Sequence, residues 1–177
     1  MTLADLKKII QDKYLHHGDY TLSSGAKSDK YFDIKSMMGD YNDMNELVNA
    51  LWEFLERPMK FKSLGGLELG GVPLVTGLSV SYQMYDVSVC YIRKSQRIHG
   101  LKKMIEGQPK NPILLVDDVI STRVTVLEAI KTCYKENYEV CGVLCVINRS
   151  GHDIIHEPKW ELLEWPIYSL FKESDFK

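Results

Sequence analysis

Residues 114–125 read Leu-Leu-Val-Asp-Asp-Val-Ile-Ser-Thr-Arg-Val-Thr and carry two adjacent carboxylates between an apolar run and a turn rich in hydroxyl groups. The apolar residues at 113–116 predict a short buried strand, and the apolar spacing over 124–135 predicts an amphipathic helix behind the turn. Hydroxyls and backbone amides at the start of a helix can bind a phosphate, and paired carboxylates suit a sugar diol or a hydrated Mg²⁺. The segment therefore predicts a binding site at the carboxyl end of a strand.

The sequence around this segment alternates short apolar runs with helical patterns. Runs rich in Val, Ile and Leu predict strands at 61–64, 87–92, 113–116 and 140–147, and helical spacing predicts helices at 72–84 and 124–135. This alternation is typical of an α/β fold with a central, mainly parallel sheet flanked by helices. Ligands bind to such sheets beyond the carboxyl ends of the strands, so we expect the functional residues in the loops that follow them.

The N-terminal segment has a different pattern. Helical spacing of apolar residues from Leu3 to Tyr14 predicts a first helix, and 20–22 and 30–34 predict short strands on either side of a turn. Asp43, followed by Glu46, resembles a capping box and predicts the start of the next helix.

Composition narrows the class of protein. The chain has 177 residues, 22 of them basic and 24 acidic, and a formal net charge of −2. We expect a single domain over 1–177, and no nucleic-acid partner because proteins that bind nucleic acid usually carry a basic surface. We expect no membrane association, because no apolar run reaches the roughly 18 residues of a span. The four cysteines form no Cys-x-x-Cys pair, which favours reduced thiols and a cytoplasmic location.

Two further loops follow predicted strands. Residues 65–71 contain four glycines in seven positions, a pattern that fits either an anion-binding turn before a helix or a tight turn alone. Residues 93–103 contain five Lys or Arg and no acidic residue. That charge suits either a solvated loop or, at a strand's carboxyl end, a mobile loop that meets phosphates.

Five ordered segments together resemble the type I phosphoribosyltransferases, and within them the orotate phosphoribosyltransferase branch. Residues 114–125 are similar to the signature of that family for phosphoribosyl pyrophosphate (PRPP), and 67–73 (Leu-Glu-Leu-Gly-Gly-Val-Pro) to its pyrophosphate loop. Residues 20–33, 93–107 and 147–149 (Ile-Asn-Arg) resemble its N-terminal motif, its mobile loop and the end of its next strand.

The resemblance implies the type I phosphoribosyltransferase fold, with a small hood over residues 1–35 and a core over 36–177. It implies transfer of ribose 5-phosphate from PRPP to orotate, which gives orotidine 5′-monophosphate and pyrophosphate. It also implies Mg²⁺ as cofactor, carried by PRPP with no direct protein ligand, and a homodimer in which the mobile loop reaches the neighbouring site.

Matched position by position, the resemblance also implies a set of site residues. The diphosphate would be bound by Lys94, Arg97 and His99 with the backbone of Glu68, Leu69, Gly70 and Gly71, and Arg93 would also contact substrate. Asp117 and Asp118 would hold the ribose hydroxyls, directly or through water on Mg²⁺. Ser121, Thr122, Arg123, Val124 and Thr125 would bind the 5′-phosphate, while Tyr31 and Phe32 would flank the base and Arg149 would meet a carbonyl or carboxylate of orotate.

The sequence departs from the family pattern at three places. Ser23 replaces a lysine that contacts PRPP and the base, with Lys27 nearby, and Arg97 replaces the mobile-loop lysine. Arg123 and Val124 replace two glycines of the phosphate loop, where a left-handed Val would be strained. Besides an active orotate phosphoribosyltransferase, two readings therefore stay open: a non-catalytic relative that binds PRPP or a nucleotide, and transfer to another base.

Overall fold

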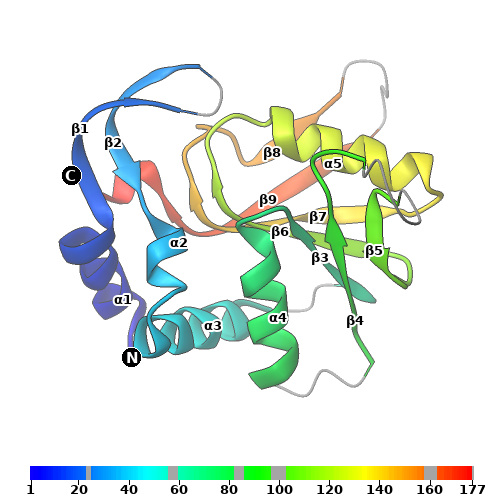
Figure 1. The fold of residues 1–177 in the computed structure, drawn as a ribbon, viewed down its shortest axis with the longest axis horizontal. Helices are drawn as coiled ribbons and strands as arrows, with labels where there is room; N and C mark the ends of the chain where they lie inside the picture. The colour runs from blue at the N-terminus through cyan, green and yellow to red at the C-terminus, as the bar shows by residue number, and fades with distance from the viewer. Residues whose placement is uncertain (23–24, 56–59, 82–85, 97–102, 158–162, 177) are drawn as a thin grey trace.

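The structure, a computed structural model, describes residues 1–22, 25–55, 60–81, 86–96, 103–157 and 163–176. These residues form a two-stranded sheet near the N-terminus and a seven-stranded sheet with the strand order β5-β4-β3-β6-β7-β9-β8 (Figure 1). All neighbours among its five central strands are parallel, while the two edge strands run antiparallel. The predicted α/β class with a mainly parallel sheet is confirmed.

The predicted hood segment, residues 1–35, contains a helix and a hairpin and ends within a short second helix. Thr2 caps the first helix, because its hydroxyl accepts from the Asp5 amide while the Asp5 carboxylate accepts from the Thr2 amide. The hairpin strands are longer than predicted and pair from Leu15 opposite Phe32 to Thr21 opposite Lys27. The elements are α1 (Leu3–Ile9), a π-helical turn (Ile10–Tyr14), β1 (Leu15–Thr21), β2 (Lys27–Phe32) and α2 (Ile34–Met37).

The next helix, α3 (Tyr41–Leu55), begins before the predicted cap. Asp40 caps it, since its Oδ1 accepts from the amides of Asn42 at 2.9 Å and Asp43 at 3.0 Å. Asp43 is buried and instead accepts hydrogen bonds from the Tyr14 hydroxyl at 2.6 Å and Lys13 Nζ at 2.8 Å. The prediction of Asp43 as the cap is wrong, because this carboxylate ties the hood to the core.

The seven-stranded sheet has helices on both faces. In Figure 1, α3 and α4 (Gly71–Ser81) lie on one side of the sheet and α5 (Val124–Lys135) lies on the other. The strands are β3 (Ser63–Leu67), β4 (Ser88–Ile92), β5 (Ile105–Gly107), β6 (Ile113–Ile120), β7 (Val140–Asn148), β8 (Ile154–His156) and β9 (Glu164–Lys172). Among the described residues, no helix combines the length and the apolar character needed to cross a bilayer.

Strand β6 shows why its sequence is continuously apolar. Leu114 and Val116 belong to the buried cluster on the α3 and α4 side, whereas Ile113 and Leu115 belong to the cluster that contains α5. Successive side chains of a strand point to opposite faces, so a strand covered on both faces needs apolar residues at every position.

Some boundaries differ from the predictions. Strand β3 includes Gly65 and Gly66, which the sequence placed in a turn, because a Cβ at Gly65 would lie 2.9 Å from Ile113 Cγ2 and one at Gly66 would lie 2.7 Å from the Gly71 carbonyl oxygen. Strand β6 continues to Ile120, so both aspartates lie within the strand and not after it. Strands β5, β8 and β9 and helix α2 were not predicted, and residues 82–84 of the predicted helix lie outside the described residues.

Candidate active site

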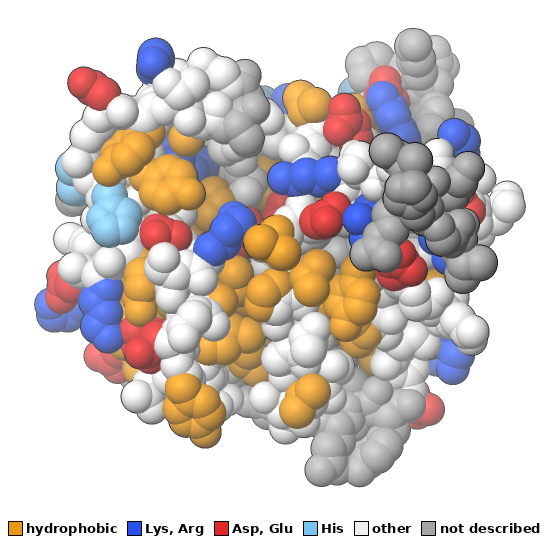
Figure 2. Space-filling model, in the orientation of Figure 1, with side chains coloured by type: hydrophobic (Ala, Val, Ile, Leu, Met, Phe, Trp, Pro, Cys, Tyr) orange, Lys and Arg blue, Asp and Glu red, His pale blue; other side chains and the backbone are white. Residues whose placement is uncertain are grey.

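A cavity of about 330 Å³ lies at the carboxyl ends of β3 and β6. Strand β4 pairs with one edge of β3, and β6 pairs with its other edge. The direction in which the chain adds strands to the sheet therefore changes between β3 and β6, and open α/β sheets bind ligands at such a point. Figure 2 shows side chains of both charges across the middle of this face, between the hood and the end of the sheet. The lining residues are Thr21, Leu22, Tyr31, Phe32, Lys35, Glu68, Leu69, Gly70, Lys94, Asp117, Asp118, Val119, Ile120, Ser121, Thr122, Thr125, Val126 and Arg149.

Two adjacent carboxylates form the floor of this cavity. Asp118 is buried at 4% exposure, and its amide donates to Asp117 Oδ1 at 2.9 Å. Burial and the neighbouring Asp118 carboxylate raise the pKa of Asp117 well above its ordinary value. The pair therefore concentrates negative charge in a site that favours a cation or a hydrogen-bond donor.

Lys35 supplies a cation to this pair and was not among the residues that the sequence singled out. Its ammonium group forms an ion pair with Asp118 Oδ2. Partial burial lowers the pKa of Lys35, but the Asp118 and Asp117 carboxylates outweigh burial and raise the pKa overall. The one signal in the sequence was its position, two residues after the N-terminal motif at 20–33.

Two glycines of the loop after β3, Gly70 and Gly71, are required by close contacts with the Asp118 carboxylate and with β6. A Cβ at Gly70 would lie 2.1 Å from Asp118 Oδ1, and a Cβ at Gly71 would lie 1.9 Å from the Val116 carbonyl oxygen. Neither space can hold a side chain, so these glycines allow the loop to lie directly against the end of β6. Gly71 starts α4 and does not line the cavity, whereas Glu68, Leu69 and Gly70 do.

The basic loop begins at the rim of the cavity. The Lys94 amide donates to Glu68 Oε2 at 3.0 Å, and Lys94 lines the cavity. Arg93 lies outside the cavity lining, 3.9 Å from both Glu68 and Glu106. Arg97 and His99, predicted to bind diphosphate, lie outside the described residues.

The hydroxyl-rich turn leads from β6 into α5. Ser121, Thr122 and Thr125 line the cavity, but Arg123 and Val124 do not. Arg123 has right-handed helical dihedrals, and its Nη1 donates to the Ile154 carbonyl at 3.5 Å. Val124 is 60% exposed as the first residue of α5 and is not among the residues with positive φ. The turn therefore avoids the left-handed Val considered above.

The hood and the end of β7 close the other side. Phe32 is buried and Tyr31 is 39% exposed, and Arg149 places its Cζ 5.4 Å from the Phe32 ring centroid. Lys27, which is near in sequence to the lysine position that Ser23 occupies, donates to Thr21 Oγ1 at 2.7 Å and does not line the cavity. Ser23 lies outside the described residues.

The chain is similar to several known proteins. It is 33% identical over 147 residues to an orotate phosphoribosyltransferase of Pyrococcus abyssi, which covers 81% of this chain and 79% of the relative. It is 30% identical over 181 residues to the Bradyrhizobium diazoefficiens orotate phosphoribosyltransferase, with 98% and 95% covered. The chain belongs to the orotate phosphoribosyltransferase family. No protein-family profile matches it.

Solved structures agree with this family. The Mycobacterium tuberculosis orotate phosphoribosyltransferase in complex with Fe(III) dicitrate superimposes with a TM-score of 0.73 at 26% identity, and 98% of this chain and 97% of that chain are covered. A structure of the same mycobacterial protein with PRPP has a TM-score of 0.72 at 21% identity, with coverage of 98% and 97%. Orotate phosphoribosyltransferases are glycosyltransferases, which confirms the class of enzyme that the motifs implied.

Proposed function

We propose that this protein transfers ribose 5-phosphate from PRPP to N1 of orotate, which gives orotidine 5′-monophosphate and releases pyrophosphate. The observation that carries the proposal is the Asp117–Asp118 pair, with Asp118 buried against Gly70, in one cavity with the hydroxyls of 121–125 and with Lys94. This arrangement offers carboxylates for a sugar diol, a helix start for a monophosphate and a cation for a diphosphate.

In the reaction, the bond between the anomeric carbon and the pyrophosphate oxygen breaks, and a bond from that carbon to N1 of orotate forms. Positive charge develops on the ribose ring as the leaving group departs, as in glycoside chemistry. Asp117 and Asp118 would accept hydrogen bonds from the ribose hydroxyls and face that charge. Lys94, with Arg97 and His99 of the mobile loop and the Glu68–Gly71 backbone, would bind the departing diphosphate, with Arg93 beside them.

The two ends of the substrate pair would be held at opposite sides of the cavity. The Ser121, Thr122 and Thr125 hydroxyls and the amides that start α5 would bind the 5′-phosphate, with Arg123 and Val124 in the same turn. Tyr31 and Phe32 would flank the flat base, and Arg149 would donate to one of its oxygens. The hood over 1–35 would then exclude water from the reacting carbon.

Mg²⁺ fits the chemistry of this site. Its preferred ligands are oxygens, and burial of Asp117 beside Asp118 gives a carboxylate pair that a nearby cation would stabilise. We propose that the ion arrives with PRPP and that Asp117 and Asp118 contact it through water. When bound, it would neutralise charge on the diphosphate leaving group.

A homodimer would complete the site by adding the mobile loop of a second subunit.

A cytoplasmic location fits four cysteines that are free thiols, of which Cys90, Cys133 and Cys145 are buried. Burial raises the pKa of the Cys90 and Cys133 thiols to about 12, so both stay protonated and unreactive at neutral pH.

The test is to incubate purified protein with orotate, PRPP and Mg²⁺ and to follow the loss of orotate absorbance. We expect loss that requires both PRPP and Mg²⁺, and little PRPP consumption with uracil or a purine in place of orotate. If PRPP binds in calorimetry but orotate is not consumed, the protein is a non-catalytic relative. Consumption of PRPP with another base alone would also contradict the proposal.

A further inference from the structure

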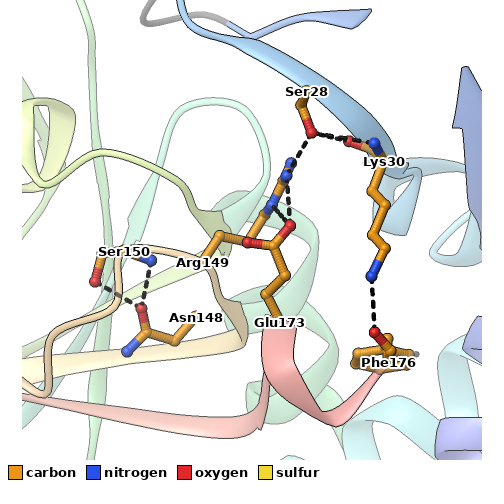
Figure 3. A network of polar contacts seen from close by, with 7 residues as sticks. All are labelled: Ser28, Lys30, Asn148, Arg149, Ser150, Glu173 and Phe176. Carbon is orange, nitrogen blue, oxygen red and sulfur yellow. Dashed lines mark hydrogen bonds and ion pairs between the residues drawn. The ribbon is translucent and has the colours of Figure 1, made fainter. Parts of the chain in front are cut away.

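The guanidinium of Arg149 is held by a carboxylate from the C-terminal end of the chain. Arg149 Nε and Nη2 both donate to Glu173 Oε1, at 3.0 Å and 2.7 Å, and Nη2 also donates to Ser28 Oγ at 2.8 Å (Figure 3). These partners come from a 3₁₀ turn after β9 (Glu173–Asp175) and from β2 of the hood. Three distant parts of the sequence therefore meet at one side chain.

The backbone of Arg149 is fixed as firmly as its side chain. Its amide donates to the Ile120 carbonyl at 2.7 Å, which attaches the end of β7 to the end of β6. The preceding Asn148 is 4% exposed, and its Oδ1 accepts from the Ser150 amide at 3.0 Å and the Ser150 hydroxyl at 2.7 Å (Figure 3). Because the Arg149 backbone is anchored, its hydrogen bonds to Glu173 and Ser28 set the orientation of the guanidinium.

The 3₁₀ turn that carries Glu173 is itself anchored to the hood. Phe176 is buried, with its ring centroid 5.1 Å from that of Phe32, and its carbonyl accepts from Lys30 Nζ at 2.8 Å (Figure 3). Asp175 accepts from the Lys172 amide at 2.7 Å, which closes the turn. Glu173 therefore projects from a turn that is held in place by the contacts of Asp175 and Phe176.

The bonds to Glu173 and Ser28 use Nε and Nη2, and in the described part of the chain no hydrogen bond is formed by Nη1. The side chain is 6% exposed and lines the active-site cavity with its Cζ over Phe32. One face of the guanidinium is thus covered by the ring, and one edge is occupied by Glu173. Nη1 is left to donate to a planar ligand beside Phe32.

We propose that Glu173 is a positioning residue for recognition of the base: through Oε1 it fixes the Arg149 guanidinium so that Nη1 meets an oxygen of orotate. This inference rests on the proposed function and goes beyond it, because it assigns the C-terminal turn a role in base binding. Glu173 does not touch the substrate and acts through Arg149.

A matched pair of variants tests the role of the acceptor oxygen. Glu173→Gln keeps Oε1 at the same length of side chain, whereas Glu173→Met keeps the size and removes the acceptor. We expect Met to raise the KM for orotate about tenfold and Gln about threefold or less, because a lost hydrogen bond to a charged group contributes roughly that much to affinity. The KM for PRPP should change less than about twofold in both, since the PRPP contacts lie elsewhere. Ser174→Ala, an exposed neighbour, is the control and should match the wild type.

A double-variant comparison asks whether Glu173 acts through Arg149. In an Arg149→Ala background, Glu173→Met should have no further effect on the KM for orotate. An unchanged KM in Glu173→Met, tighter orotate binding, an equal effect without Arg149, or failure of this variant to fold would each overturn the inference. If the wild type consumes orotate while any of these results holds, the proposed function stands and the role of Glu173 is rejected. If the wild type does not consume orotate, the proposed function and the role of Glu173 are both rejected.

Discussion

The ammonium group of Lys35, at the end of the hood, forms an ion pair with the carboxylate of Asp118 near the end of β6. The Asp118 side chain is 6% exposed and that of Lys35 is 49% exposed, so the pair joins a buried anion to a half-solvated cation. Asp118 therefore has a protein partner for its charge, and this partner connects the two sides of the cavity.

Lys35→Met removes that partner and leaves Asp118 buried without its cation. We expect the free energy of unfolding to fall by about 1 kcal/mol, less than for a fully buried pair because water screens the exposed side of Lys35. Urea unfolding of Lys35→Met, Asp118→Asn and the double variant measures the coupling. Losses that simply add would show that the two residues do not stabilise each other.

Replacement of Asp117 should change how the stability of the protein depends on pH, because ionised Asp117 is unfavourable beside the Asp118 carboxylate. Because burial and Asp118 raise its folded-state pKa, the folded protein binds more protons than the unfolded chain between the two pKa values. The stability of the wild type should therefore fall as the pH rises from about 4 through the raised pKa, and Asp117→Asn should lack this loss.

Urea unfolding over that pH range checks the sign. The Asn variant should be more stable than the wild type at neutral pH, and the difference should shrink towards about pH 4. The exposed Asp19→Asn serves as the control. A difference that does not depend on pH would contradict the raised pKa.

Arg123 stands where the family has a glycine, and among the described residues the hydrogen bond of its side chain is to the Ile154 carbonyl, at a long 3.5 Å. A guanidinium held this weakly can turn to a phosphate bound at 121–125. We expect Arg123→Ala to weaken PRPP binding about tenfold, with a much smaller effect on orotate. Calorimetric titration of PRPP with Mg²⁺ measures this. If Arg123→Gly with Val124→Gly binds PRPP more tightly than the wild type, Arg123 obstructs the phosphate site instead.

The proposed shared site can be tested by mixing subunits. One inactive chain carries Arg97→Ala with His99→Ala, and the other carries Asp117→Asn with Asp118→Asn. If the mobile loop acts in the neighbouring subunit, hybrid dimers contain one intact site and should recover part of the activity. Subunits that exchange, as measured by mass spectrometry of the mixture, and yet stay inactive would contradict the shared site.

The sequence predicted which loops meet at the cavity better than it predicted the limits of the strands. Asp117, Asp118 and Gly70 were predicted from motif chemistry, and the structure brings them into one cavity. Glu173 and Lys35 escaped prediction because each acts through a partner more than 20 residues away in sequence, and no local pattern records such a contact.

The limits of β3 and β6 were missed for a related reason. Gly65 and Gly66 indicate a turn when read alone, but tertiary packing against Ile113 and Gly71 requires small residues inside a strand. Asp117 and Asp118 likewise end the apolar run without ending the strand, because pairing with β7 continues to Ile120 opposite Asn148. In both cases tertiary pairing outweighs local propensity.

The most direct test of the account is the activity of the chain that carries Asp117→Asn and Asp118→Asn. Both substitutions keep the size of the side chains, so the fold should be intact by circular dichroism and thermal melting. The account predicts that the wild type consumes orotate with PRPP and Mg²⁺, and that the folded double variant is slower by about a hundredfold or more, as expected when charge stabilisation of a transition state is removed. Orotate consumption at the wild-type rate by the folded double variant would contradict the account.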